Sequence, residues 1–108
     1  NHLVCEVRIS FIQAALGVTI EVPTLDGSEK LRIPPGTQSG EIFRLKGRGM
    51  KDLESRRLGD LFIKVQVLTP DNLSKDQKNL LRQLAELRGE KTDFIDLQTV
   101  RKGKESVH

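Results

Sequence analysis

Few residues of this chain could carry acid–base, nucleophilic or metal chemistry, and their spacing forms no catalytic pattern. His2 and His108 lie at the two ends of the 108 residues, and Cys5 is the only cysteine. No Cys/His spacing suits a zinc ion, and no paired base or second thiol accompanies Cys5. We therefore predict no catalytic residue, no metal site and no cofactor, and we interpret Cys5 as a small apolar residue of a strand.

The acidic residues and glycines that could suggest an active site have structural explanations. Asp26 and Gly27 are typical of a hairpin turn, and Asp60 stands at the start of a strand. The glycines of residues 46–49 do not follow a strand and open a helix, as a phosphate-binding loop requires. The sequence therefore predicts a protein that is not an enzyme.

Positive charge is concentrated in residues 40–57. This segment has six basic and three acidic side chains, and the difference equals the net charge of +3 of the whole chain. The basic residues are Arg44, Lys46, Arg48, Lys51, Arg56 and Arg57. Such a segment can meet nucleic acid, an acidic peptide tail or only water. The lack of interleaved aromatic side chains for base stacking argues against nucleic acid.

Length and hydropathy predict one domain with a modest core built mainly from aliphatic side chains. No apolar run approaches the roughly 20 residues that cross a bilayer, and no basic start followed by an apolar segment marks export. We expect a cytoplasmic protein without a membrane partner.

The first part of the chain predicts a strand followed by a short helix. An apolar residue stands at every second position from Leu3 to Ile9, which places Leu3, Cys5, Val7 and Ile9 on one face of a strand and Val4, Glu6 and Arg8 on the other. Ser10 and Gln13 form a capping box that begins a helix, and we expect Gly17 to end it in the left-handed helical conformation. So short a helix must pack on a sheet.

Four further strands are indicated by alternation and by turn residues. Residues 18–22 and 29–33 flank the hairpin turn and are expected to pair antiparallel. Two prolines after Ile33 stop the second of these strands, and a further strand follows at 42–46. The segment 47–59 has no period and is expected to be a mobile loop. Residues 61–67 form the longest alternating run, which suits the middle of a two-layer sheet packing.

A second helix is predicted near the C-terminus. Ser74 and Gln77 form another capping box, and Gly89 follows the last helical residue. The helix gathers four leucines on one stripe: Leu80, Leu81, Leu84 and Leu87. Either the chain's own sheet or a second copy of the chain must cover this stripe, and periodicity does not decide between them.

Four segments carry a family resemblance. Residues 9–17, 21–27, 33–50 and 58–61, in this order and at this spacing, are similar to the second C-terminal β-domain of DnaJ-type co-chaperones. The similarity runs from about Leu3 to about Leu87. It implies a mainly β, two-layer sandwich-like domain at 1–73 and an amphipathic dimerisation helix at 74–89. For residues 90–108 the faint amphipathy of their apolar side chains and the charged end predict, independently of the resemblance, a short segment that assists the dimer contact and a frayed tail.

The resemblance also implies a function. Members of this family capture unfolded polypeptide as homodimers and deliver it to a DnaK-type, ATP-driven chaperone. The His-Pro-Asp signature with which the J-domain stimulates ATP hydrolysis does not occur among these residues, and neither does a cysteine-rich zinc module. The expected role is therefore that of a co-chaperone fragment that dimerises and binds clients, with the DnaK-type partner reached through the full-length protein.

Two sets of site residues follow from the resemblance. The dimer contact is expected at the leucine stripe. The peptide-binding positions, transferred from the homologous preceding domain, are Cys5, Val7, Phe11, Ile20 and Val22. Alternation alone also predicts ordinary core membership for each of them.

Two other functions stay open at this point. One is a dimerisation and spacer module without a client groove. The other is a small basic β-module for nucleic acid, which would depend on Arg44, Lys46, Arg48, Arg56 and Arg57.

Overall fold

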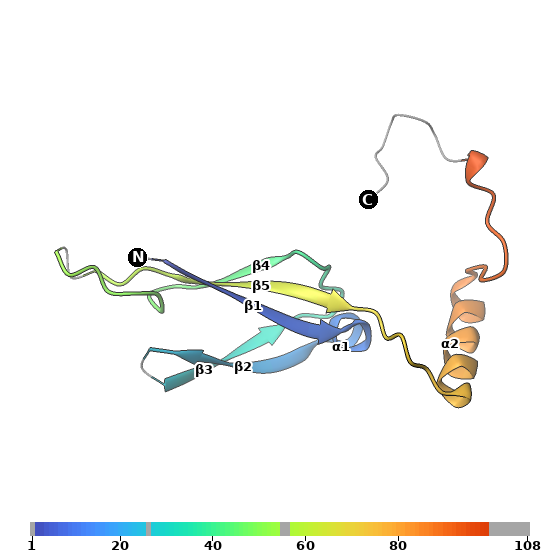
Figure 1. Cartoon of the computed structure of the whole chain (residues 1–108), viewed down its shortest axis with the longest axis horizontal. Helices are drawn as coiled ribbons and strands as arrows, with labels where there is room; N and C mark the ends of the chain where they lie inside the picture. Colours follow the sequence, from blue (N-terminus) through green and yellow to red (C-terminus); the bar gives the residue numbers. More distant parts are fainter. Residues whose placement is uncertain (1, 26, 55–56, 100–108) are drawn as a thin grey trace. The chain divides into compact units, whose positions relative to one another are not determined.

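The computed structural model describes residues 2–25, 27–54 and 57–99, and the chain divides into two compact units after Pro70. The first unit holds all five strands and the first helix, and the second holds the C-terminal helix (Figure 1). The mainly β fold predicted from the sequence is confirmed. The division into 1–73, 74–89 and 90–108 stays a prediction.

A three-stranded sheet forms one layer of the first unit. Its strand order is β1 (Leu3–Ser10), β5 (Leu61–Leu68) and β4 (Ile42–Leu45). β1 runs parallel to β5, with Leu3 opposite Leu61, whereas β4 runs antiparallel to β5. The predicted central place of the longest alternating run is confirmed, because β5 has a strand on each side.

The second layer is a hairpin. β2 (Val18–Thr24) and β3 (Gly27–Ile33) pair antiparallel, with Val18 opposite Ile33. This is the predicted pairing. Asp26, the predicted turn residue, lies outside the described residues.

The helix α1 (Phe11–Leu16) connects β1 to β2. Its capping box is present: the N–H of Gln13 donates to Ser10 Oγ at 3.0 Å, and the N–H of Ser10 donates to Gln13 Oε1 at 2.9 Å. The expected left-handed helical cap at Gly17 is wrong, because φ is +86° but ψ is 151°. This extended conformation with positive φ starts β2 at once, and a Cβ there would approach Arg32 Nη2 to 2.7 Å.

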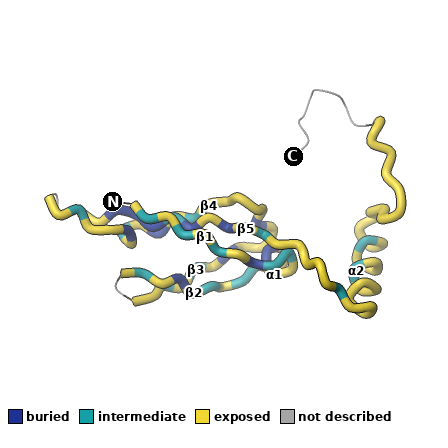
Figure 2. Tube along the Cα trace, viewed as in Figure 1, coloured by how far each residue is buried: buried dark blue, intermediate teal, exposed yellow. Residues whose placement is uncertain are grey.

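The core lies between the two layers. Ile63 and Val65 of β5 and Ile33 of β3 have no solvent exposure, and Ala14 of α1 is buried with them. Figure 2 shows this burial concentrated in the strands of the first unit. The two-layer packing that the alternation predicted is therefore confirmed.

The Pro-Pro-Gly loop between β3 and β4 is tied to α1 and to β5. The N–H of Gly36 donates to the carbonyl of Ala14 at 2.9 Å, and the N–H of Gly40 donates to the carbonyl of Val65 at 2.7 Å. Thr37, which is buried, donates its hydroxyl to the carbonyl of Pro34 at 2.6 Å. The loop is therefore held in place by backbone groups on α1 and β5.

The segment between β4 and β5, expected to be an aperiodic loop, is a two-stranded ribbon in its described part. The N–H of Gly49 donates to the carbonyl of Gly59, the N–H of Gly59 donates to the carbonyl of Met50, both at 2.9 Å, and Lys51 forms a β-bridge with Leu58. We call residues 46–54 and 57–59 the β4–β5 ribbon. Its pairing continues the β4–β5 hairpin. The sequence did not predict this pairing, because the segment is charged, rich in glycine and without alternation.

The second unit contains α2 (Lys75–Arg88) and a short 3-10 turn, η1 (Leu97–Thr99). The predicted capping box of Ser74 and Gln77 is confirmed by hydrogen bonds of 3.1 and 2.9 Å, and Gly89 has the left-handed conformation with φ +70°. Of the predicted tail 90–108, residues 100–108 lie outside the described residues. None of the helices among the described residues is long and apolar enough to cross a membrane.

We expect Ile63→Ala to lower the free energy of unfolding by about 2–5 kcal/mol, because it opens a cavity between the layers. The matched change Ile42→Ala, on an exposed position of β4, should cost about 1 kcal/mol or less. Urea titration followed by circular dichroism measures both values. Equal losses for the two variants would contradict the packing described above.

Candidate functional site

The inner face of β1 is only partly covered by the rest of the domain. Cys5 stands opposite Ile63 and Val7 stands opposite Val65 in the parallel ladder. The two β5 residues are fully buried, whereas Cys5 and Val7 are half-buried and pack against the core from its side. At these two pairs the residue of the edge strand is less buried than its partner on the central strand, whereas Ile9 farther along β1 is itself buried. The core is therefore partly open beside Cys5 and Val7.

On the hairpin, the two predicted peptide-binding positions have different environments. Ile20 is half-buried and packs on the same cluster as Cys5 and Val7. Val22 is 1% exposed and is itself a member of that cluster. The structure thus places Cys5, Val7 and Ile20 around one part of the core, which we call the edge surface, with Val22 beneath it.

Both strands beside this edge surface have one unpaired backbone edge. Among the described residues, β1 pairs with β5 alone and β2 pairs with β3 alone. Each strand therefore presents a row of N–H and C=O groups that no other strand satisfies. Such a row can bind an extended chain of any sequence, since backbone groups are the same in every polypeptide.

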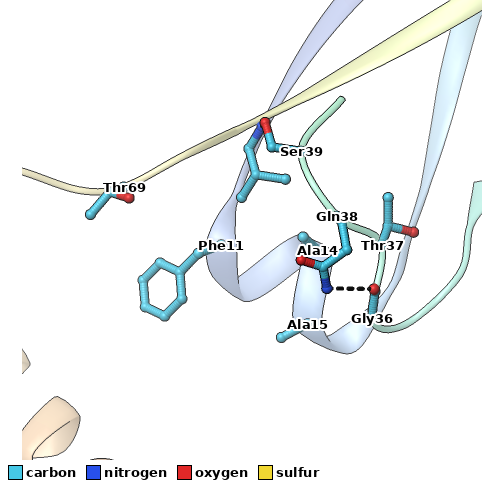
Figure 3. Close-up of a pocket in the computed structure, with 9 residues that line it drawn as sticks. Phe11, Ala14, Ala15, Gly36, Thr37, Gln38, Ser39 and Thr69 are labelled. Atoms are coloured by element: carbon cyan, nitrogen blue, oxygen red, sulfur yellow. Dashed lines mark hydrogen bonds between the residues drawn. The ribbon is translucent and has the colours of Figure 1, made fainter. Parts of the chain in front are cut away.

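Phe11 lies elsewhere, in a hollow of about 420 Å³ at the end of the sheet. The hollow is bounded by α1, by the loop 36–39 and by the end of β5. Figure 3 shows Phe11 at its side, with Gln38 and Ser39 on the loop across from the helix. Gln38 donates its side-chain amide to the carbonyl of Gly36 at 3.1 Å, which orients that side chain along the loop. Phe11 therefore belongs to a second apolar surface.

The leucine stripe on α2 is exposed in the single chain. Leu80, Leu84 and Leu87 are 64, 46 and 86% exposed, and Leu81 is half-buried. Three further apolar residues beyond Gly89 are exposed as well: Phe94, Ile95 and Leu97. The second unit thus exposes apolar side chains both on α2 and beyond Gly89.

The basic residues of the predicted nucleic-acid alternative are partly engaged with carboxylates. Arg44 Nε lies 2.5 Å from Asp60 Oδ2, and Arg48 forms an ion pair with Glu29 of β3. Lys46 and Arg57 are exposed on the β4–β5 ribbon, and Arg56 lies outside the described residues. These pairs neutralise part of the charge that nucleic acid would need.

Asp60 joins the end of the sheet to the β4–β5 ribbon, a role the sequence did not indicate. It is 7% exposed; its Oδ1 accepts the N–H of Gly47 at 2.9 Å, and its Oδ2 accepts from Arg44. The N–H of Gly47 holds the pKa of Asp60 below its ordinary value; Arg44 acts in the same direction, while loss of water acts in the opposite one.

His2 contacts the other side of the same residue. Its Nδ1 accepts the N–H of Asp60 at 2.7 Å, and its ring lies edge-on to Phe62 with centroids 5.4 Å apart. The N–H of Leu3 donates to the carbonyl of Asp60 at 2.9 Å. Asp60 is thus the residue at which β1, β4 and β5 meet. Its place just before the longest strand was the only available signal in the sequence.

Within the described ranges, no three His, Cys, Asp or Glu side chains lie close enough together to hold a metal ion. Comparison with known proteins identifies the family of the first unit. Residues 1–70 match the protein family described as the DnaJ C terminal domain, which is more than half of the chain.

The chain belongs to the DnaJ C-terminal domain family. The resemblance carried by residues 9–61 is therefore confirmed. The match covers the edge surface, the hollow and Asp60, and it ends before α2 begins.

Curated relatives extend the similarity over the second unit. The chaperone protein DnaJ of Halothermothrix orenii is 47% identical over 106 residues, which cover 98% of this chain and 28% of the relative. The proteins of the same name from Brevibacillus choshinensis and Haloarcula marismortui are 55% and 56% identical, over 84% and 79% of this chain and 24% and 22% of each relative. The chain spans about a quarter of the length of these relatives.

In this DnaJ C-terminal domain, we expect Asp60→Asn to lower the free energy of unfolding at pH 7. The folded-state pKa of Asp60 is depressed, so its contribution is present above the unfolded value of about 4 and is lost as the pH falls through the folded value. The variant should therefore lose less stability than the parent between about pH 5 and pH 2. Urea titrations across this range measure the difference.

The matched control is Asp71→Asn, which changes an exposed carboxylate in the other unit. It should leave the pH dependence of unfolding of the first unit unchanged. A pH dependence of Asp60→Asn equal to that of the parent would contradict the role assigned to this carboxylate.

Proposed function

We propose that this chain is the part of a DnaJ-type co-chaperone that binds unfolded polypeptide and joins two copies of the protein. The shared name of its relatives, chaperone protein DnaJ, supports the general role. The edge surface of the first unit supports client binding, and the leucine stripe of the second supports a homodimer. We assign delivery of the client to a DnaK-type chaperone to the full-length protein, and we propose that this protein is cytoplasmic.

The observation that carries client binding is the set of half-buried apolar side chains beside two unpaired strand edges. An extended client segment can add to the edge of β1 or β2, where its backbone satisfies N–H and C=O groups. Its alternate side chains then meet Cys5, Val7 and Ile20, which are apolar and partly accessible. Val22 supports this surface from below as part of the core.

Selectivity for unfolded chains follows from these contacts. A folded protein has already paired its backbone and buried its apolar side chains, so it presents neither group to the edge surface. The hollow beside Phe11 supplies a second apolar contact on the same unit, and its volume is within the range of small-ligand pockets. We assign this hollow to a client side chain.

The homodimer rests on the exposed face of α2. Burying one leucine contributes about 1.5–3 kcal/mol, so the stripe of four gives a second copy a substantial apolar contact. The exposed Phe94, Ile95 and Leu97 can extend the same contact. Two client-binding units held in one dimer bind a long client more tightly than either alone, because the second contact becomes intramolecular.

We expect an unfolded, leucine-containing peptide to shift the amide resonances of β1 and β2, with Cys5, Val7 and Ile20 among them. Ile20→Thr should weaken the binding about fivefold or more, because it removes about 1 kcal/mol of apolar contact from the surface. Titration followed by nuclear magnetic resonance measures both quantities.

Two controls accompany this titration. Ile42→Thr makes the same change on β4 and should leave affinity unchanged. A peptide with prolines at alternate positions lacks the N–H groups for strand addition and should bind weakly. Absence of shifts on β1 and β2 would reject client binding at the edge surface. The alternative function, a dimerisation and spacer module without a client groove, would then be favoured.

We expect Leu84→Gln combined with Leu87→Gln to raise the dissociation constant of the homodimer by at least about 100-fold, because about 3 kcal/mol of leucine burial is lost. Glutamine keeps the helix, since its helix propensity is close to that of leucine. Sedimentation equilibrium over a range of concentrations measures the change.

Lys78→Gln combined with Arg82→Gln is the matched control on the opposite side of α2 and should leave the mass unchanged. A parent chain that remains a single copy at high concentration would reject the homodimer, whatever the variants do.

A further inference from the structure

The β4–β5 ribbon takes no part in the function proposed so far, although it is the most prominent projection of the first unit. Figure 1 shows the chain between β4 and β5 extending well past the end of the β2–β3 hairpin. Its two strands are joined by hydrogen bonds at Gly49, Gly59 and Asp52 and by the bridge between Lys51 and Leu58. The base of the ribbon is fixed through the N–H of Gly47 to Asp60.

The ribbon is cationic. Its described residues include four basic side chains and two acidic ones. Two of the four, Lys46 and Lys51, are exposed and have no carboxylate within ion-pair distance among the residues described. Their charge is therefore available to a partner.

The ribbon is also apolar at its outer part. Leu53 is 87% exposed, and Met50 and Leu58 are about half exposed. Lys51 forms the β-bridge with Leu58 and stands two positions before Leu53, so this cation lies in the same part of the ribbon as two of the aliphatic residues. Each aliphatic contact that is covered would contribute favourably, since its surface leaves water.

The acidic residues of the ribbon distinguish between possible partners. Asp52 and Glu54 flank Leu53, the most exposed aliphatic residue. A flat anionic membrane that received Leu53 would bring its head groups against the exposed carboxylate of Glu54, which is electrostatically unfavourable. A nucleic acid would meet the same repulsion without any aromatic side chain on the ribbon for base stacking.

A polypeptide avoids this conflict because its charges are discrete. Its carboxylates can lie beside Lys46 and Lys51, and its apolar side chains can lie on Leu53, Met50 and Leu58. We propose that the β4–β5 ribbon is a second client-contact surface, which binds acidic, aliphatic segments of unfolded polypeptide. This inference rests on the proposed function and deepens it. The edge surface binds clients without regard to charge, and the ribbon adds a preference for acidic segments.

Three short unfolded peptides with identical leucines test the proposal, with glutamate, glutamine or lysine as the intervening residues. Lys46→Gln combined with Lys51→Gln should weaken binding of the glutamate peptide by at least about fivefold and leave the glutamine peptide unchanged. Added salt should remove most of the difference between these two peptides. Fluorescence anisotropy of labelled peptides measures the affinities.

Lys75→Gln combined with Lys78→Gln removes the same charge from α2 and should not change the preference for the glutamate peptide. Leu53→Ser should weaken the glutamate peptide as well, because it removes the exposed aliphatic contact. All four substituted lysines and Leu53 are exposed, so these variants should fold as the parent does.

Equal affinity of the ribbon variant and the parent for the glutamate peptide would overturn the proposal. A second result would also overturn it. If vesicles containing phosphatidylserine bound the parent but not the ribbon variant, while both proteins bound the glutamate peptide equally well, the ribbon would be assigned to lipid. The glutamine peptide separates failure of this proposal from failure of client binding at the edge surface. If the edge surface binds no client, the glutamine peptide will bind neither the parent nor the variants.

Discussion

The double pairing of β5 is the constraint on which the rest of the domain depends. This strand is hydrogen-bonded to β1 on one side and to β4 on the other, and its inward residues Ile63 and Val65 are completely buried. Because all the backbone groups of a central strand are satisfied within the sheet, its apolar face can form the floor of the core. Strands with a free edge then carry inward positions that are only partly covered, such as Cys5 and Val7 on β1 and Ile20 on β2.

The local features of the fold could be predicted from the sequence because residues near in sequence determine them. Both capping boxes join residues three positions apart, at Ser10 and Ser74, and both are present. The β2–β3 register follows from a short turn between two alternating runs. The parallel pairing of β1 with β5 joins the two ends of the domain and has no local signal, so alternation predicted the strands without predicting their neighbours.

The same distinction explains the candidate site. Alternation marks Cys5, Val7, Ile20 and Val22 alike as inward-facing, but exposure depends on which strand lies beside each one. Only Val22 proves to be inside the core, and Phe11 lies apart in the hollow. Asp60 resembled any polar residue before a strand, because its partners Gly47, Arg44 and His2 are distant in sequence. The leucine stripe was found because a helix repeats its period within a few turns.

The parallel β1–β5 ladder has a consequence for how the chain acquires this fold during synthesis. A ribosome produces β1 first, and its hydrogen-bonding partner β5 is made last of the five strands. Until β5 emerges, the apolar face of β1 has no place in a sheet, and contacts between distant segments of this kind form slowly. The nascent domain therefore passes through a stage in which it exposes an extended apolar segment of its own. At that stage it has the chemical character of the clients that the finished protein is proposed to bind.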